Sequence, residues 1–427
     1  MASSQLSTQR IPLELKLMIL GQYGLTRQDL AALCLVRPFS TAGQIKLYHS
    51  YDGDYKSIAL FLSTILQHKA LAQYVKHVYL HGLHAPSSPT NCLETNQLNL
   101  FICHAKRLPI AGNVRSQWVR LLRHSHGEAL AALLIAHLPQ LQKLEIREEY
   151  QYTLRERGLS KFLILGQPIW TFTLSLHAKR PSRLPRFGYL RTIKLHCLPF
   201  SAQALSTFFS MPAVRSLHVW DVFESRIRKG AFGFGTSYIS DLSFTNASIS
   251  LTSLKAMILS CKSIIRFAYN CPADSHISRQ YPELLEILSS FADTVETLTF
   301  RDQHWWSRNI SPIRQLTPFL NLHHFTADSA VVCQDVQKYP LSSIFPACIR
   351  SIQLLDVFPS LLAQLGTSGL LNDLQVKKFP HLSKITLVRG LVLHGDGIND
   401  EIAEMFFVEN GIKLEILNRV IIENGET

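Results

Sequence analysis

A six-residue pattern of apolar and polar positions recurs along most of the chain. In each copy the first, fourth and sixth positions are apolar, and the other three vary. Ten copies begin at Val75, Leu141, Leu190, Val214, Ile239, Ile264, Val295, Leu322, Ile349 and Leu382. The last four positions of each copy alternate in the way that a short strand with one buried face requires. We therefore predict one strand for each copy.

The copies follow one another at near-regular spacing. From Leu141 onward the starts are separated by 49, 24, 25, 25, 31, 27, 27 and 33 residues, and residues 169–174 match the pattern within the longest gap. Helix-like segments with apolar residues three and four apart lie between strands, at residues 128–137, 202–210, 251–260 and 282–291. One strand and one helix cannot bury their apolar faces alone, but stacked copies can. The predicted fold is an α/β solenoid with a curved parallel sheet and outer helices.

The pattern also predicts how the chain is divided. Residues 1–50 form a helical unit, and residues 51–427 form the repeat domain. Residues 87–116 are polar and contain Pro89 and Pro109, so we expect a long insertion loop there. The segment before Thr427 is expected to be a last, atypical repeat that caps the array.

Residues 11–49 follow a helical pattern. Pro12 suits the first turn of a helix that runs to about Leu20. Thr26 and Asp29 have capping-box spacing at the start of a second helix, Pro38 breaks it, and a third runs over residues 40–48. A unit of about 40 residues buries only part of so many apolar side chains. The surplus must lie against the repeat domain or against another protein.

The order of residues in this unit resembles an F-box. The resemblance rests on Ile11-Pro12-x-Glu14-Leu15, Ile19-Leu20, Asp29-Leu30, Leu33-Cys34-Leu35-Val36, Phe39, Ala42 and Leu47-Tyr48. Ile11 stands where the family motif has Leu, and Arg37-Pro38 replaces the usual polar pair after Val36. The rest of the chain resembles the irregular leucine-rich repeats that follow the F-box in many fungal F-box proteins, although the Asn that usually follows each strand is mostly missing.

This resemblance implies a substrate receptor of an SCF-type cullin-RING ubiquitin ligase. In that family the F-box binds a Skp-family adaptor, which docks on the cullin-RING ligase, and the distal domain binds a protein substrate. The motif match assigns the adaptor contact to Pro12, Leu15, Ile19, Leu30, Leu33 and Val36. Such a receptor needs no catalysis, so we expect no enzymatic activity and no cofactor. The alternative is a repeat-based protein-interaction scaffold outside any ligase.

Composition narrows the class of protein further. Of the 427 residues 47% are hydrophobic and 17% are charged, which excludes wholesale disorder. The longest apolar run, residues 129–138, is shorter than the about 20 residues of a membrane helix, and residues 1–10 lack the apolar stretch of a signal peptide. The eight cysteines are dispersed, as in a protein with reduced thiols. We expect an intracellular protein, cytoplasmic or nuclear, with no membrane or nucleic-acid partner.

The net charge of +12 favours an acidic partner. In a solenoid, residues between the buried strand positions share one face, where a basic surface suits an acidic or phosphorylated segment. The predicted substrate-binding residues are Lys143, Arg191, Lys194, Arg215, His218 and, as an anchor at the rim, Trp305. The alternatives are that the charges only solvate the sheet and that Trp305 packs into the neighbouring repeat.

Two groups of residues have the appearance of chemical sites. Residues 395–400, Gly-Asp-Gly-Ile-Asn-Asp, match a loop of haloacid-dehalogenase-type phosphatases, but the only nearby Asp-x-Asp, Asp52-Gly-Asp54, follows no predicted strand. His77, His81 and His84 have ligand spacing for a helix, but residues 75–80 are a predicted strand, which would point these side chains in different directions. We therefore predict a turn and helix cap for the first group and no metal site.

Overall fold

The computed structural model describes residues 11–22, 24–82, 93–108, 112–147, 187–196, 200–220, 222–223, 230–247, 249–271, 281–302, 312–332, 343–357, 378–389 and 412–418. The chain forms two compact units. Unit 1 comprises Met1–Leu198 and Ser210–Val214, and unit 2 comprises Pro199–Phe209 and Arg215–Thr427.

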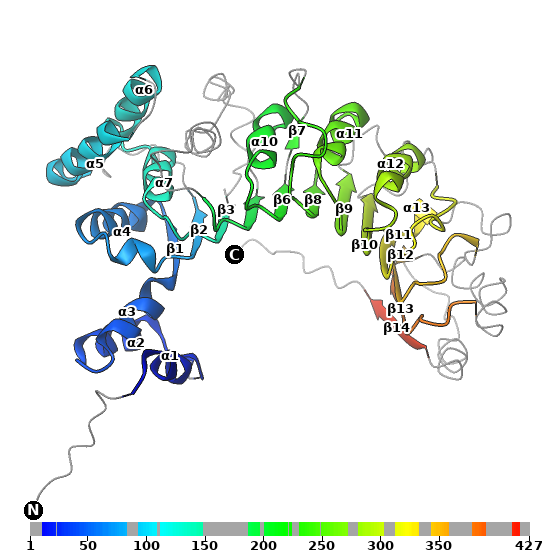
Figure 1. Cartoon of the computed structure of the whole chain (residues 1–427), viewed down its shortest axis with the longest axis horizontal. Helices are drawn as coiled ribbons and strands as arrows, with labels where there is room; N and C mark the ends of the chain where they lie inside the picture. The colour runs from blue at the N-terminus through cyan, green and yellow to red at the C-terminus, as the bar shows by residue number, and fades with distance from the viewer. Residues whose placement is uncertain are drawn as a thin grey trace, which may run out of the picture. The chain divides into compact units, whose positions relative to one another are not determined.

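Unit 1 begins with three helices and continues with parallel strands and further helices (Figure 1). Its helices are α1 (Leu13–Gln22), α2 (Arg27–Leu35), α3 (Ser40–His49), α4 (Tyr55–Gln67), the short 3-10 helix η2 (Leu71–Gln73), α5 (Thr95–Arg107), α6 (Gly112–Arg123) and α7 (Gly127–Ala136). Its strands are β1 (Ser50–Asp54), β2 (His77–His81), β3 (Lys143–Arg147) and β4 (Thr192–His196), side by side in that order.

Unit 2 continues the same strand-and-helix arrangement. Its helices are α10 (Ala202–Phe209), α11 (Leu251–Ser260), α12 (Tyr281–Leu288), the 3-10 helix η6 (Ser289–Phe291) and α13 (Ser329–Val332). Eight parallel strands lie side by side: β6 (Ser216–Trp220), β8 (Asp241–Thr245), β9 (Arg266–Cys271), β10 (Thr297–Asp302), β11 (His324–Asp328), β12 (Ser351–Val357), β13 (Lys384–Arg389) and β14 (Lys413–Asn418). Two short strands, β5 (Phe200–Ser201) and β7 (Val222–Phe223), pair separately.

All ten predicted strands are present, and their buried positions align in register. In unit 1 the fourth-position residues Val78, Leu144 and Ile193 pair across β2, β3 and β4. In unit 2 the same ladder runs through Leu217, Leu242, Phe267, Leu298, Phe325, Ile352, Ile385 and Leu414. The parallel sheet with one strand for each repeat is therefore leucine-rich-repeat-like within each unit.

The start of each strand is fixed by a repeated hydrogen-bond pattern. The carbonyl of Lys76, at the second position of its copy, accepts the backbone N–H groups of Gln142 and Lys143 at 2.7 and 3.0 Å. The carbonyl of Arg215 accepts those of Ser240 and Asp241 at 2.9 and 3.0 Å in the same way. The second position thus lies in the turn before the strand, and only the third and fifth positions belong to the exposed strand face.

Aromatic side chains fill much of the core of unit 2. The rings of Phe267, Phe300 and Phe325 are neighbours, with centroids 6.2 and 6.5 Å apart. Tyr281 of α12 and Phe345 add further contacts at 5.5 and 5.4 Å. Such contacts add about 1 kcal/mol each to the burial of the rings. The strand ladder and the helical layer therefore share one apolar core.

The structure places helices where we expected a long loop. Residues 95–107 and 112–116 belong to α5 and α6, whereas residues 87–116 were predicted to be an insertion loop. The segment is polar overall, but its few apolar residues have helical spacing. Phe101 and Ala105 are buried on one side of α5, and Asn99 and Cys103 are exposed on the other. Trp118 on α6 is buried, and its indole N–H donates to the carbonyl of Ala129 on α7 at 2.9 Å.

The second helix begins as its sequence predicts. The backbone N–H of Asp29 donates to the Thr26 hydroxyl at 3.2 Å, and the backbone N–H of Thr26 donates to the Asp29 carboxylate at 2.9 Å. These reciprocal bonds form a capping box at the start of α2. Hydrogen bonds from the side chain and backbone of Thr26 lower the pKa of Asp29.

One histidine makes the stability of unit 1 sensitive to pH. His137 follows α7, its ring lies 5.1 Å from that of His104, and its Nε2 is buried without a hydrogen-bond partner in the described residues. Burial, then His104 and Lys69, lower the pKa of His137 from 6.5 to about 4. The folded protein therefore holds this ring neutral at a pH where the unfolded chain binds a proton.

We predict that acidification from about pH 7 to pH 5 lowers the free energy of unfolding by about 2 kcal/mol through His137. The contribution is complete above the unfolded pKa of 6.5 and is lost as the pH falls toward the folded pKa of about 4. Urea titrations at both pH values measure it. His137→Gln should reduce the pH dependence, whereas His124→Gln, at an exposed position, should leave it unchanged. Equal pH dependence in wild type and His137→Gln would contradict the assignment.

Candidate partner-binding surfaces

The three N-terminal helices are held together by small residues of α3. Ala42 and Gly43 are buried, and α3 packs against both α1 and α2. A Cβ at Gly43 would lie 3.1 Å from the Sγ and 3.2 Å from the backbone N of Cys34, so glycine permits the close approach of α2 and α3. This packing requires few large side chains.

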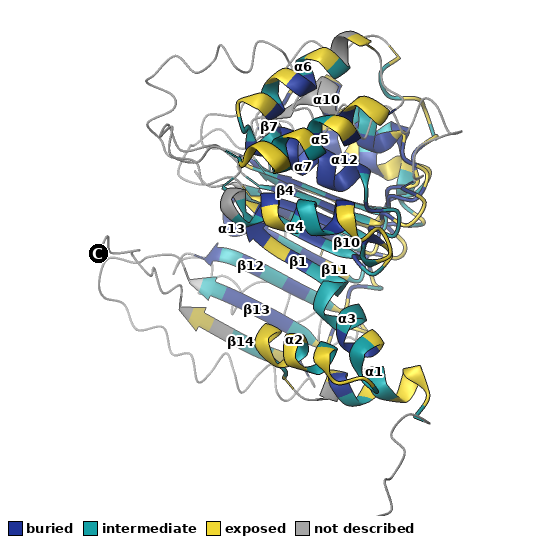
Figure 2. Cartoon of the chain, turned by 90° about the vertical axis from the view of Figure 1, so that its left-hand side faces the viewer, coloured by how far each residue is buried: buried dark blue, intermediate teal, exposed yellow. Residues whose placement is uncertain are grey.

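Most of the apolar residues of these helices consequently stay accessible. Among the described residues 11–22 and 24–49, only Leu20 and Ala42 belong to the buried apolar core. Figure 2 shows α1 and α2 largely in the colours of exposed and half-buried residues. We use "head surface" for the exposed large apolar residues Leu13, Leu15, Met18, Leu35 and Val36. Leu35 is 88% exposed, and nothing in the described chain covers it.

The residues predicted to contact an adaptor are all at least partly accessible. Pro12 and Leu15 are exposed at the start of α1, and Val36 is exposed at the end of α2. Ile19, Leu30 and Leu33 are half-buried. The prediction omitted three members of the head surface, Leu13, Met18 and Leu35. The sequence could have indicated Leu35. Apolar residues occupy most sides of α2, and only one side of that helix can face α3.

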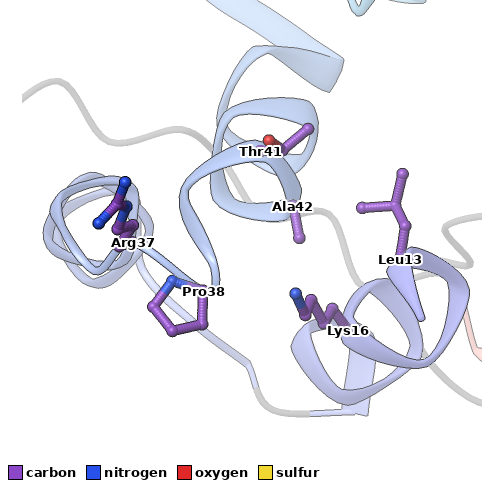
Figure 3. A pocket seen from close by; sticks show the side chains of 6 residues that line it. All are labelled: Leu13, Lys16, Arg37, Pro38, Thr41 and Ala42. Atoms are coloured by element: carbon purple, nitrogen blue, oxygen red, sulfur yellow. The ribbon is translucent and has the colours of Figure 1, made fainter. Parts of the chain in front are cut away.

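A hollow of 360 Å³ lies on the same helices. It is lined by Leu13, Lys16, Arg37, Pro38, Thr41 and Ala42. Figure 3 shows Leu13 and Lys16 on α1, opposite Thr41 and Ala42 on α3. Its lining combines apolar side chains with the cations of Lys16 and Arg37, so it can accept an apolar side chain beside an acidic one.

The strand face of unit 1 carries a charged cluster around Glu145 of β3. Its side chain is 5% exposed and lies 2.6 Å from Arg147 Nη2, 3.3 Å from Lys143 Nζ and 3.5 Å from His196 Nε2. Lys143 also lies 4.7 Å from the centre of the Tyr79 ring. Burial raises the pKa of Glu145, but the hydrogen bonds from Arg147 and Lys143 outweigh it and leave that pKa below its ordinary value. The carboxylate is thus held ionised.

Cations outnumber acids on this part of the face. Lys143, Arg147 and Lys194 lie at strand-face positions of β3 and β4, where Glu145 is the single acid. A net positive charge of two remains when His196 is neutral. The predicted basic face is therefore present on β3 and β4.

The strand face of unit 2 is more evenly balanced. Arg266 of β9 lies 3.0 Å from Asp241 of β8, and Arg301 of β10 lies 3.8 Å from Asp328 of β11. Burial raises the pKa of Asp241, but His218 and Arg266 lower it by more. The pKa of Asp241 therefore lies below its ordinary value. The predicted basic face does not extend evenly along the repeats.

The predicted substrate-binding residues therefore separate into two groups. Lys143 and Lys194 lie on the strand face of unit 1, and His218 lies on that of unit 2. Arg191 and Arg215 occupy second positions, immediately before β4 and β6 and outside the strands themselves. Arg215 instead lies 4.9 Å from the ring centre of Tyr238. Trp305 lies outside the described residues.

Three side chains on unit 2 resemble a hydrolytic triad in composition but not in arrangement. The Ser216 Oγ lies 2.7 Å from His218 Nε2 and donates to Asp241 Oδ2 at 3.1 Å. The same carboxylate oxygen lies 3.5 Å from His218 Nε2. A serine relay places the hydroxyl and the carboxylate on opposite ring nitrogens. Here both face one nitrogen, so the group holds the strands together electrostatically and lacks the relay geometry.

The described part of the chain also lacks the features of a metal site and of a membrane span. There, no three His, Cys, Asp or Glu side chains gather as a possible metal site, and no helix has both the length and the apolarity to cross a bilayer. Five cysteines lie in these ranges, and all are free thiols: Cys34, Cys103, Cys261, Cys271 and Cys348. Residues 395–400 and His84 lie outside the described residues.

Removal of the Glu145 charge provides a test of the cluster. Glu145→Gln should lower the free energy of unfolding by about 1 kcal/mol, because Lys143 and Arg147 then repel each other without a neutralising carboxylate. Urea unfolding measures the change. Glu286→Gln, at an exposed position of α12, is the matched control and should have little effect. Indistinguishable effects of the two substitutions would contradict the stabilising role of the cluster.

Known proteins offer few similarities to this chain. No protein-family model and no curated protein matches the chain. Among solved structures, an internalin from Listeria monocytogenes is similar with a TM-score of 0.33 and 10% sequence identity, over 96% of this chain and 90% of that chain. A likeness at this score and identity carries no argument. The leucine-rich-repeat-like arrangement of each unit therefore rests on the strand register and the repeated hydrogen bonds described above.

Proposed function

We propose that the chain is the substrate receptor of an SCF-type cullin-RING ubiquitin ligase. The three N-terminal helices bind a Skp-family adaptor, and the repeats bind a protein substrate. The chain itself performs no chemistry in this role. It raises the effective concentration of a substrate lysine near a ubiquitin thioester that another subunit holds.

The observation that carries the proposal is the head surface. Small residues of α3 fix the three helices, so the large apolar side chains of α1 and α2 are free to contact another protein. Several exposed large apolar residues on a short helical unit are typical of a unit that binds another protein. Its position agrees with the F-box resemblance, because Leu15 and Val36 belong both to the motif and to the head surface.

The second candidate function is a repeat-based scaffold outside any ligase. The paired charges on the unit 2 strand face favour neither candidate, since both need a protein-binding repeat surface. The two differ in what binds the head surface. An adaptor-bound head supports the ligase, whereas a head surface that binds no Skp-family adaptor supports the scaffold.

We predict that the purified chain binds a Skp-family adaptor and that Leu15→Asp with Val36→Asp weakens this binding at least about tenfold. Both side chains are 45–46% exposed, so their replacement spares the packing of the helices. Leu30 is less suitable, because it is half-buried and its substitution would also disturb the fold. Co-expression, co-purification and calorimetric titration measure the binding.

Leu60→Asp is the matched control for this experiment. Leu60 is 66% exposed on α4, outside the three helices, and its substitution should leave adaptor binding unchanged. Equal adaptor binding by wild type and the double variant would contradict the proposed adaptor contact. Failure of the wild-type chain to bind any Skp-family adaptor would favour the scaffold.

We also predict that the β3–β4 face contributes to substrate capture. Lys143→Glu with Lys194→Glu reverses two charges there and should reduce capture several-fold, while Lys255→Glu on an exposed position of α11 should not. Quantitative comparison of proteins cross-linked to each variant in cells measures capture. Identical sets of cross-linked proteins for all variants would show that this face is merely solvated.

A further inference from the structure

A second charged surface lies on the helices of unit 1, apart from the strand face and the head surface. The sequence from Thr95 to Gly127 contains five Lys and Arg residues and no Asp or Glu. It covers α5 and α6, two consecutive helices that pack against each other as a hairpin (Figure 1). With its histidines neutral, this stretch therefore carries a net charge of +5.

The packing of the hairpin decides which cations reach solvent. Phe101 and Ala105 on α5 and Trp118 and Leu122 on α6 are buried. The opposite sides are exposed and carry Lys106 and Arg107 at the end of α5 and Arg120 and Arg123 at the end of α6. Because the two helices of a hairpin run antiparallel, the two pairs lie at opposite ends of it. We call the four residues together the basic hairpin surface.

The four cations have no acidic partner within the described part of the chain. None of them takes part in an ion pair there, in contrast to the cations of the β3–β4 face that surround Glu145. Arg115, the fifth cation, is already engaged, because its guanidinium donates to the carbonyl of Leu108 at 3.2 Å.

The positive field of this region also acts on its neighbours. Burial lowers the pKa of His104 on α5, and Arg107 and Lys69 lower it further. Lys69 is exposed just after α4 and extends the positive region beyond the hairpin. The folded chain therefore concentrates like charges here without compensating them, at a cost to its own stability.

Helix dipoles account for only part of this arrangement. Cations in the last turn of a helix are favourable, and all four lie in or near the last turns of α5 and α6. The same effect favours acids at the start of a helix; Glu94 is the N-cap of α5, but the first turns of both helices contain no acid. Stabilisation of the helices alone therefore does not explain the charge of the hairpin.

We propose that the basic hairpin surface binds an acidic segment of a partner protein. Carboxylates supply the missing partners, and arginine forms two parallel hydrogen bonds with a carboxylate. This interaction is separate from the adaptor contact and from the β3–β4 face, so it does not depend on the proposed ligase role.

The chemistry of the surface favours protein over nucleic acid or membrane. The large apolar residues that are exposed in the described chain include none from α5 or α6, so no side chain there would insert into a bilayer or stack on a base. Four cations are also fewer than the roughly six to ten phosphate contacts of strong duplex binding. An acidic peptide presents one carboxylate per residue, and an extended segment of about six or more residues is long enough to reach both ends of the hairpin.

The test uses the full chain and a fluorescein-labelled dodecaglutamate peptide at low salt. Wild type should bind the peptide, and Arg120→Glu with Arg123→Glu should weaken binding at least about tenfold. Lys106→Gln with Arg107→Gln, which only removes charge, should weaken it by a smaller factor. Lys255→Glu with Arg350→Glu reverses two exposed charges of unit 2 and should change it less than about twofold. Circular dichroism establishes that each variant is folded.

Two competing probes decide the class of partner. A DNA duplex and phosphatidylserine vesicles are compared with the peptide at equal anionic charge and equal salt. Tighter binding of the peptide than of the other two probes, weakened in both hairpin variants, supports the proposal. It is overturned if the folded variants bind the peptide as wild type does, if the control pair weakens binding equally, or if the duplex or the vesicles bind more tightly than the peptide.

Discussion

The structure depends on the in-register stacking of two apolar positions in every repeat. A parallel strand buries its fourth and sixth pattern positions only if the neighbouring strands present theirs at the same height, as Leu242, Phe267 and Leu298 do. The carbonyl in the preceding turn accepts two N–H groups of the next repeat and sets that height. Register in turn assigns the remaining side chains, because the third and fifth positions must lie on the opposite face.

The three N-terminal helices are held together by a different kind of packing. Their contacts use Ala42 and Gly43, which bring backbones together but cover little apolar area. The capping box at Thr26 and Asp29 stabilises α2 locally, without tertiary packing. The exposure of Leu15, Leu35 and Val36 is therefore a consequence of how the helices are joined, and it is the basis of the proposed adaptor contact.

The positive charge of the chain is distributed unevenly by the fold. On the strand face of unit 2, Arg266 and Arg301 each lie near an acid of the neighbouring strand. On β3, Lys143 and Arg147 lie beside the buried carboxylate of Glu145, and on the α5–α6 hairpin four cations pair with no acid of the described chain. Net charge alone indicated an acidic partner, whereas the local pairing of charges indicates where such a partner would bind.

The sequence by itself determined the strands and helices whose patterns are local. The alternation in each copy predicted all ten strands, and the Thr26–Asp29 spacing predicted the start of α2. Tertiary structure decided what depends on distant residues. It placed Arg191 and Arg215 in turns, because a carbonyl one repeat away fixes where each strand begins. It made α5 and α6 an ordered hairpin, because residues such as Phe101 and Trp118 are apolar anchors only where other helices cover them. A sequence pattern specifies which face of an element is apolar, but only packing determines what that face meets.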